Sequence, residues 1–401
     1  MQLVERHILR DKIYFDVCIK AKELYNQSLY YCRQSNFKNI DYFTEFELTT
    51  LFAEFNEPTY RALPSQTSQQ VIKLLFKNIK SWQKARKEYA KNPSNFLGRP
   101  KLPNYKKETS ICLFTSQQIR LKGEFIHFPK QTNLEPLKTR QNNVQQVRII
   151  PKNTHCIVEI VYNYKEIDKK EYNDKWLGID LGLNNLATCI SNDSAFIVNG
   201  KALKSINHYY NKRKRLLQSK LRENIHSSRR IERITHKRNN KVNDYLHKAS
   251  KIIVYNSIKE NVTKIIIGKN ENWKQKINIG KKSNRQFTSI PHATLIEKIT
   301  YKAQMVGIET IVTQEAYTSK CSAIDLEPIQ KHETYLGKRK KRGLFVTSSG
   351  KLINADGNGA LNIARLGLKR ASCNEIIISE RVLSCVSQPK KISVLHKMQI
   401  N

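Results

Sequence analysis

Residues Trp176–Ile190 read WLGIDLGLNNLATCI and contain one charged side chain, Asp180. The stretch begins as an apolar run, turns at Gly182 and resumes as a second apolar segment, which predicts two β-strands joined by a turn. Burying an unpaired carboxylate there is costly, so we expect Asp180 at a surface, in an ion pair or on a metal ion. We interpret it as a metal ligand, although Gly-x-Asp-x-Gly turns also begin sugar kinases and actin-like ATPases.

The composition predicts a polyanionic partner. The 401 residues include 71 Lys and Arg against 34 Asp and Glu, which gives a net charge of +37 and a pI near 9.9. Charge of this size repels itself unless a polyanion neutralises it, so we expect nucleic acid. The chain has neither an apolar run of about 18 residues nor a signal-peptide pattern. We therefore expect a cytoplasmic protein with no membrane partner.

The cysteines indicate a reducing compartment and no structural zinc. A zinc ribbon needs two close Cys-x-x-Cys pairs, and none occurs here. The eight cysteines are Cys18, Cys32, Cys112, Cys156, Cys189, Cys321, Cys373 and Cys385.

The N-terminal part predicts a β-domain with a helical insertion. Apolar residues recur at helical spacing within residues 15–94, and Pro64 and Ser65 mark the start of a second helix. After the Pro- and Gly-containing linker at 95–105, the period changes to two, as in small antiparallel barrels. If residues 1–14 add a strand to a barrel formed by residues 95–170, the helical segment is an insertion in it. Its basic, Tyr-bearing faces could hold a nucleic-acid backbone.

Two segments after Asp180 predict a basic hairpin and a parallel crossover. Residues 201–260 carry 17 Lys and Arg against four acids and read as a long helical hairpin that contacts phosphates. Thr263–Gly268, a helix at about 293–306 and Glu309–Thr313 form a strand, helix and strand in order. The ends of parallel neighbours meet, so Glu315 and, beyond the first strand, Glu271 are candidates to join Asp180.

Asp356 lies in the sequence NADGNGALNI, just before an apolar helical pattern. A carboxylate at this place often caps a helix, and that alternative stays open for an isolated Asp. The surrounding asparagines and glycines favour a functional site.

With Asp180, Glu315 and Asp356 identified, residues 176–366 resemble the RuvC-like nuclease domain of TnpB (OrfB) proteins. These are RNA-guided endonucleases of insertion sequences, related to type V CRISPR effectors. The resemblance rests on GIDLGLNNLAT, on the region from NWKQ through YTSKCSAIDLEP, on YLGKRKKRGLF and on NADGNGALNI. It implies an α/β RNase H-like fold over residues 171–370 and an N-terminal wedge-like β-barrel with an inserted α-helical recognition lobe. Residues 371–401 carry no informative pattern, and we expect them to form a poorly ordered C-terminal tail.

The resemblance also implies a DED triad that holds divalent metal. Asp180 and Asp356 match the first and third acids, whereas Gly268 stands where many relatives have the second. A branch with GxNxxWK at that point has a glutamate before YTSK, and Glu315 matches it. Neighbouring parallel strands lie about 4.8 Å apart, and a glutamate side chain on the next strand can span much of that distance. Glu271 remains the less favoured alternative because it lies among lysines and asparagines in an expected turn.

A second departure concerns the zinc ribbon of many relatives, of which only Cys321 remains. We expect residues 321–350 to be held by packing and to serve as a target-binding loop. Gln314 and Gly357 also differ from the residues expected beside the acids. The basic residues expected to contact nucleic acid are Lys212, Arg213, Lys214, Arg215, Lys320, Lys338, Arg339, Lys340, Lys341 and Arg342.

These features predict two-metal hydrolysis of DNA. Three carboxylates in one pocket repel one another and become stable together around Mg²⁺ or Mn²⁺, and two such ions can activate water and stabilise a leaving 3′ oxygen. The resemblance implies a transposon-derived guide RNA and a target DNA with a short flanking motif. We expect a monomer.

Two alternatives remain. A TnpB-like protein that has lost cleavage would act as a guided DNA-binding repressor, and Gly268 is the feature that favours it. A generic basic RNA-binding protein would have no use for three acids at strand and helix ends.

Overall fold

The computed structural model describes residues 1–37, 43–165, 167–269, 284, 288–371, 373 and 376–394. The chain divides into two compact units, Met1–Lys165 and Glu166–Asn401. Both units mix helices and strands, so the mixed α/β class predicted from the sequence is confirmed. None of the helices in the described ranges is long and apolar enough to span a bilayer.

The first unit is built on an antiparallel sheet with strand order β1-β7-β6-β2. β1 (Gln2–Leu9) pairs with β7 (His155–Asn163) along its whole length, and β6 (Val144–Lys152) joins β7 to β2 (Cys112–Thr115). The N-terminal strand therefore belongs to the sheet, and the helices between β1 and β2 interrupt it in sequence. A second antiparallel sheet contains β3 (Arg120–Lys122), β4 (Phe125–His127) and β5 (Leu137–Lys138). The strands thus form two separate sheets, and the closed barrel stays a prediction.

Four helices form the inserted segment: α1 (Lys12–Phe37), α2 (Glu45–Glu54), α3 (Pro58–Arg61) and α4 (Ser65–Lys91). α4 begins at Ser65, as Pro64 predicted. One face of α4 is buried through Val71, Leu75 and Ile79, because apolar residues three and four apart lie on the same side of a helix. A single core continues from these helices into the sheet.

The second unit is organised around a six-stranded mixed sheet with strand order β12-β11-β8-β9-β10-β16. β8 (Trp176–Leu181), β9 (Asn185–Ser191) and β10 (Ala195–Asn199) form an antiparallel meander. β11 (Lys264–Gly268) is parallel to β8, and β12 (Glu309–Thr313) is parallel to β11. α8 (His292–Gln304) lies between β11 and β12 in the sequence. The predicted hairpin and parallel crossover are therefore confirmed.

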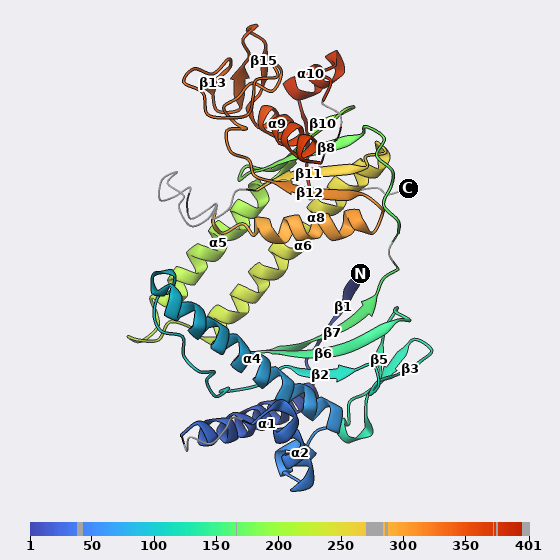
Figure 1. The fold of residues 1–401 in the computed structure, drawn as a ribbon, viewed down its shortest axis with the longest axis vertical. Helices are drawn as coiled ribbons and strands as arrows, with labels where there is room; N and C mark the ends of the chain where they lie inside the picture. Colours follow the sequence, from blue (N-terminus) through green and yellow to red (C-terminus); the bar gives the residue numbers. More distant parts are fainter. Residues whose placement is uncertain are drawn as a thin grey trace. The chain divides into compact units, whose positions relative to one another are not determined.

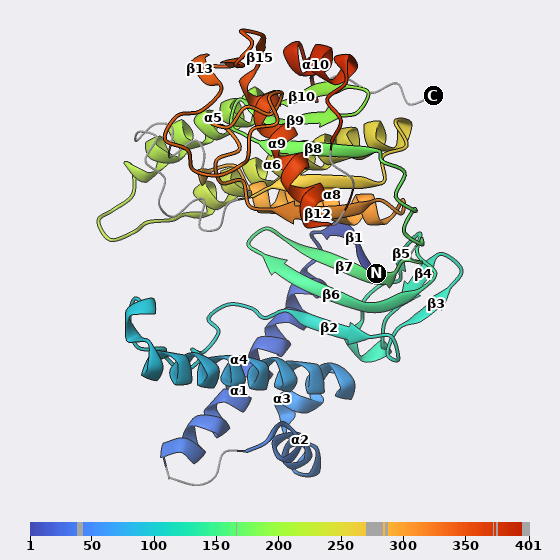
Figure 2. The ribbon, with the colours of Figure 1, turned by 45° about the horizontal axis from the view of Figure 1, so that its top comes forward.

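Helices cover both faces of this sheet, as Figure 2 shows for α9 on one face and α6 and α8 on the other. Ile265 and Ile267 join the core of α6 (Arg229–Lys259) and α8, while Ile266 joins the core of α9 (Ala355–Arg370). Successive residues of a strand point to opposite faces, so β11 is apolar at every one of these positions. Covering both faces buries the sheet and leaves its strand ends to carry polar groups.

The predicted basic hairpin is confirmed as α5 (Lys201–Gln218) and α6, which run side by side in Figure 1. The second half of α6 is buried through Ala249, Ile252 and Ile253, so that half belongs to the core. The first half of α6 and α5 carry most of the exposed basic side chains of this hairpin.

The expectation that residues 371–401 form a poorly ordered tail is wrong for residues 376–394. This segment contains α10 (Glu380–Ser387) and β16 (Lys390–Ile392), and β16 adds a parallel strand beside β10. Ser379 starts α10 by accepting a hydrogen bond from the Val382 amide. The sequence pattern missed both elements because each is very short.

Candidate functional site

Asp180 lies near the end of β8 and faces α9. Ile179 and Leu181 on either side of it join the core of the opposite face, so alternation directs Asp180 toward α9. A Cβ atom on Gly359 of α9 would lie 3.0 Å from Asp180 Oδ2. The helix therefore passes directly over this carboxylate.

Small residues permit this close approach. A Cβ atom on Gly178 of β8 would lie 2.4 Å from the Ala360 carbonyl oxygen and 2.8 Å from Ala364 Cβ. Any larger residue at Gly178 would lift α9 from the sheet. Because Asp356 lies in the first turn of α9, this packing also brings Asp356 to the end of β8.

Asp356 does not cap its own helix. The cap is Asn354, whose Oδ1 accepts hydrogen bonds from the backbone amides of Asp356 and Gly357, both at 3.0 Å. The Asp356 carboxylate is instead held from two sides: Asn185 Nδ2 donates to Oδ2 at 2.7 Å, and Arg339 lies 3.6 Å from Oδ1. Its side chain remains 32% exposed, so the carboxyl group is partly accessible from the surface. The capping alternative is wrong here.

Glu315 occupies the space above Gly268, where many relatives have the second acid. Gly268 ends β11, one residue after the pair Ile267 and Ile179, and is therefore level with Asp180. A Cβ atom on Gly268 would lie 2.5 Å from Glu315 Oε2 and 2.5 Å from Ile363 Cδ1. A side chain at position 268 would exclude the Glu315 carboxylate from this place. Glycine at position 268 therefore leaves room for the carboxylate of Glu315, which follows the neighbouring strand β12.

The acids interact electrostatically. Burial raises the pKa of Asp180 well above its usual range, and repulsion by Glu315 and Asp356 raises it further, with a partial offset from Arg339. Burial raises the pKa of Glu315 to about 7. Groups that favour protonation when buried together become stable as carboxylates when a cation joins them. The oxygen-only donor set and this excess of negative charge fit a hard divalent metal ion.

The three acids do not form a closed ligand cage. Throughout the described ranges, no three Asp, Glu, His or Cys side chains are arranged as a group that could hold a metal ion. Metal binding by Asp180, Glu315 and Asp356 therefore stays a prediction. Glu271, the alternative second acid, lies outside the described residues.

The loop after Glu315 is fixed to α9 by buried asparagines that the sequence analysis did not single out. Asn362 Nδ2 donates to the carbonyl oxygens of Thr318 and Cys321, and Asn358 Nδ2 also donates to Cys321 O. Glu327, only 2% exposed, accepts from the amides of Ser322 and Leu336. These bonds hold the described part of the region where relatives have a zinc ribbon. The NADGNGALNI motif indicated a functional helix, but the partners of its asparagines depend on the fold.

A basic cleft of about 900 Å³ opens beside Glu315. It contains four cationic side chains and no acid, and it includes the exposed Tyr317. The lining residues are Lys269, Val312, Thr313, Gln314, Ala316, Tyr317, Ile329, Gln330, Lys331, Leu366, Lys369 and Arg370. Its size and charge suit nucleotides rather than an uncharged ligand.

The basic residues expected to contact nucleic acid lie on α5, in the turn at Lys320, and on or beside β13 (Lys338–Lys341). Lys212, Arg213 and Arg215 are exposed on α5, and Lys214 is partly buried. Lys320 is exposed, with its ammonium 5.7 Å from the centre of the Tyr335 ring. The others are exposed on or beside β13, which pairs with β14 (Leu344–Val346) and leads through β15 (Leu352–Asn354) into α9: Lys338, Arg339, Lys340, Lys341 and Arg342. Arg339 has a second role because it reaches Asp356.

A stripe of lysines on α4 is a further basic surface. Six lysines recur at alternating intervals of four and three residues and are all exposed, opposite the buried face of that helix. They are Lys73, Lys77, Lys80, Lys84, Lys87 and Lys91. At 1.5 Å per residue they span about 27 Å. The regular interval was the signal in the sequence that could have identified this stripe.

The fold and the acids define the second unit as an α/β unit that gathers carboxylates at one end of a mixed sheet. Comparisons with known families are more specific. Residues 159–274 match the OrfB_IS605 family, described as a probable transposase, and residues 292–363 match the Cas12f1-like TNB domain. These matches confirm the resemblance to TnpB (OrfB) proteins that the motifs predicted. No curated protein matches the chain.

A solved structure shares the fold at low sequence identity. The mini-RNA-guided endonuclease CRISPR-Cas_phi3 is 9% identical, with a TM-score of 0.50, and the match covers 92% of each chain. A Cas12f1–sgRNA–target DNA complex is 18% identical, with a TM-score of 0.38, and that match covers 90% of this chain and 98% of the Cas12f1 chain.

Proposed function

We propose that the protein is an RNA-guided DNA endonuclease that hydrolyses guide-matched DNA at the three acids. The observation that carries the proposal is the carboxylate of Glu315 above Gly268, at the level of Asp180 and under the helix of Asp356. The strand order β12-β11-β8-β9-β10, in which three antiparallel strands precede two parallel ones along the chain, supports an RNase H-like (RuvC) fold. The motif resemblance supports the same function.

Asp180, Glu315 and Asp356 would hold Mg²⁺ or Mn²⁺. A pair of such ions supplies an activated water and charge stabilisation at the leaving 3′ oxygen. Asn185 and Arg339 fix the direction of the Asp356 carboxylate by binding one oxygen each. Arg339 also brings a positive charge to an otherwise acidic centre, where it can pair with a phosphate oxygen of the strand. The protein residues therefore orient the acids and bring the phosphodiester to them.

Basic surfaces would hold the guide and the target. Lysines contact the phosphate backbone without reading bases, so the α4 stripe and the α5 side chains suit a duplex whose sequence is read by pairing with the guide. The basic cleft beside Glu315 suits a single strand, because Tyr317 offers a stacking surface between cationic side chains. Guide RNA and target DNA are the partners that this arrangement requires.

The test is purification with co-expressed RNA, followed by Mg²⁺-dependent cleavage of a duplex that matches the bound guide. Wild type should cut, and Asp356→Ala should bind the same duplex without cutting. Glu297→Gln, which alters an exposed glutamate of α8 in the same unit, should cut normally. Binding without cleavage by the wild type would refute the nuclease and support the guided repressor instead.

A further inference from the structure

Gly357 directly follows Asp356 and breaks a local rule, because alanine favours a helix more than glycine does. The structure gives a reason in the atoms that lie beside Gly357. A Cβ atom on Gly357 would lie 3.3 Å from both Val386 Cγ1 and the Val386 carbonyl oxygen. Val386 belongs to α10 and is fully buried. Glycine at this position therefore leaves space for α10 against the first turn of α9.

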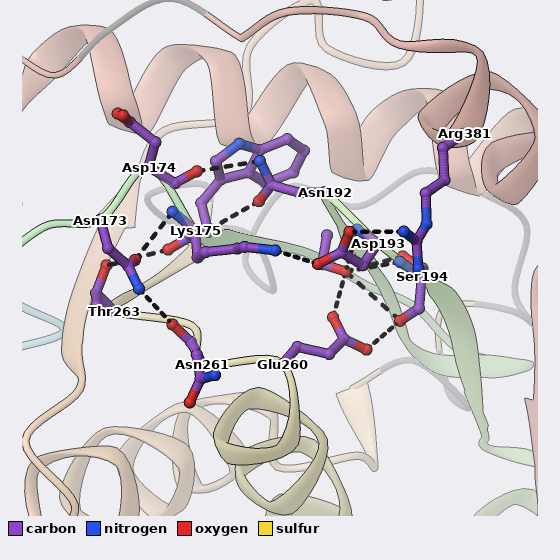
Figure 3. Close-up of polar contacts among 12 residues, drawn as sticks. Asn173, Asp174, Lys175, Asn192, Asp193, Ser194, Glu260, Asn261, Thr263 and Arg381 are labelled. Atoms are coloured by element: carbon purple, nitrogen blue, oxygen red, sulfur yellow. Dashed lines mark hydrogen bonds and ion pairs between the residues drawn. The ribbon is translucent and has the colours of Figure 1, made fainter.

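The segment that carries Val386 is tied to the sheet at separate points, several of which Figure 3 shows. Arg381 lies 3.4 Å from Asp193, a residue of the turn after β9, and Cys385 Sγ donates to the Asp193 carbonyl oxygen at 3.6 Å. Lys175 also pairs with Asp193. After α10, β16 pairs with β10 in register through Phe196 and Lys390. These contacts fix the position of α10 relative to the sheet.

The turn itself is well anchored. Ser191 and Ser194 each donate a hydroxyl hydrogen bond to Glu260 at the end of α6, and Asn192 accepts from the Trp176 amide at the start of β8 (Figure 3). Asp180 lies on the same strand as Trp176, so the turn after β9 links α10 to the strand that carries Asp180. On its other side, α10 packs against α9, the helix that carries Asp356. Val382, one turn before Val386, is also buried on α10, but none of its atoms is among the three nearest to the Cβ position of Gly357.

We propose that the C-terminal segment 376–394 is a positioning element of the acidic site, in which Val386 holds the first turn of α9 so that Asp356 faces Asp180. The first turn of a helix has few internal hydrogen bonds, so outside contacts decide where its side chains point. Asn354 supplies the cap, Asn185 and Arg339 hold the carboxylate, and Val386 supports the backbone from behind. The proposal rests on the proposed metal-dependent function, and its test separates the two.

The experiment compares four full-length variants by Mn²⁺ binding to the protein without nucleic acid, and by cleavage. Gly357→Ala adds a methyl group against Val386 and should displace the first turn of α9. We expect it to weaken Mn²⁺ binding about tenfold, as disturbing the residues behind a metal ligand commonly does. Gly357→Ala/Val386→Ala makes room for that methyl group and should recover Mn²⁺ affinity to within about threefold of wild type. Val386→Ala alone should weaken it less than Gly357→Ala. The matched control Val382→Ala loses an equal volume on α10 and should change Mn²⁺ affinity less than twofold.

Gly357→Ala with wild-type Mn²⁺ affinity, or a double variant no better than Gly357→Ala, would overturn the proposal. Wild type that binds Mn²⁺ but does not cut would refute only the nuclease. If wild type bound no Mn²⁺, hydrogen exchange of the amides of residues 355–359 would test whether Val386 supports the first turn of α9. Faster exchange in Gly357→Ala than in the double variant supports the positioning role, and equal exchange overturns it.

Discussion

Replacing Glu315 with glutamine should stabilise the metal-free protein while it abolishes cleavage. Burial raises the pKa of this carboxyl from its ordinary value of 4.5 to about 7 in the folded chain. Between these two pH values the unfolded chain has lost the proton that the folded chain keeps, so the wild type loses stability as pH rises through this window. Above pH 7 the full cost of the buried charge remains. Below pH 4.5 it disappears.

The magnitude follows from the same two values. At roughly 1.4 kcal/mol per pH unit, the interval corresponds to an upper limit of about 3 kcal/mol. Because the side chain is partly exposed, we expect Glu315→Gln to raise the free energy of unfolding by about 2 kcal/mol at pH 8. Millimolar Mg²⁺ should reduce this difference, because a bound cation stabilises the wild-type carboxylate.

Native-state hydrogen exchange of amides in β8 and α9 measures this opening free energy in the full chain. Glu333→Gln serves as the control, since it removes an exposed carboxylate of the same unit and should leave the exchange unchanged. If Glu315→Gln were less stable than wild type at pH 8, or if its gain in stability persisted at pH 4, the cost assigned to burying this carboxylate would be wrong.

Three further predictions concern other parts of the molecule. Gly268→Ala should reduce cleavage at least tenfold and destabilise the fold by about 1–3 kcal/mol in urea unfolding, because its methyl group would meet Glu315 and Ile363 at 2.5 Å. Wild-type cleavage and stability in this variant would show that the Glu315 carboxylate lies elsewhere. Reversing the charge of Lys84 should weaken binding of the co-purified RNA and lower the slope of log affinity against log salt by at least about 1 in filter binding, whereas an unchanged slope would place RNA away from the α4 stripe. Asn362→Leu should cost about 1–3 kcal/mol in urea unfolding because the Thr318 and Cys321 carbonyls lose donors, and a neutral effect would mean that the loop is held by other contacts.

The sequence predicted the parts of the site that are encoded locally. Asp180 is the only charge in an apolar hairpin, and alternation of the strand then determines the face to which it points. The order of strand, helix and strand predicted that β11 and β12 end together, which brings Glu315 near Asp180. The asparagines and glycines around Asp356 predicted that it belongs to a functional site.

Other features depend on long-range geometry and had no local signal. The overlap of the Glu315 carboxylate with the side-chain position of Gly268 depends on the path of two residues beyond β12. Asn185 and Arg339 meet Asp356 only because β9 and β13 converge on α9. α10 and β16 are too short to show a period, and their stability comes from packing against elements far away in the sequence.

The central claim is that Glu315 supplies the second acid of the site. Cleavage of a guide-matched duplex by Glu315→Gln and by Glu271→Gln, each purified with its RNA and assayed in Mg²⁺, tests it most directly. We expect Glu315→Gln to bind the duplex without cutting it and Glu271→Gln to cut like wild type. Normal cutting by Glu315→Gln together with none by Glu271→Gln would contradict it.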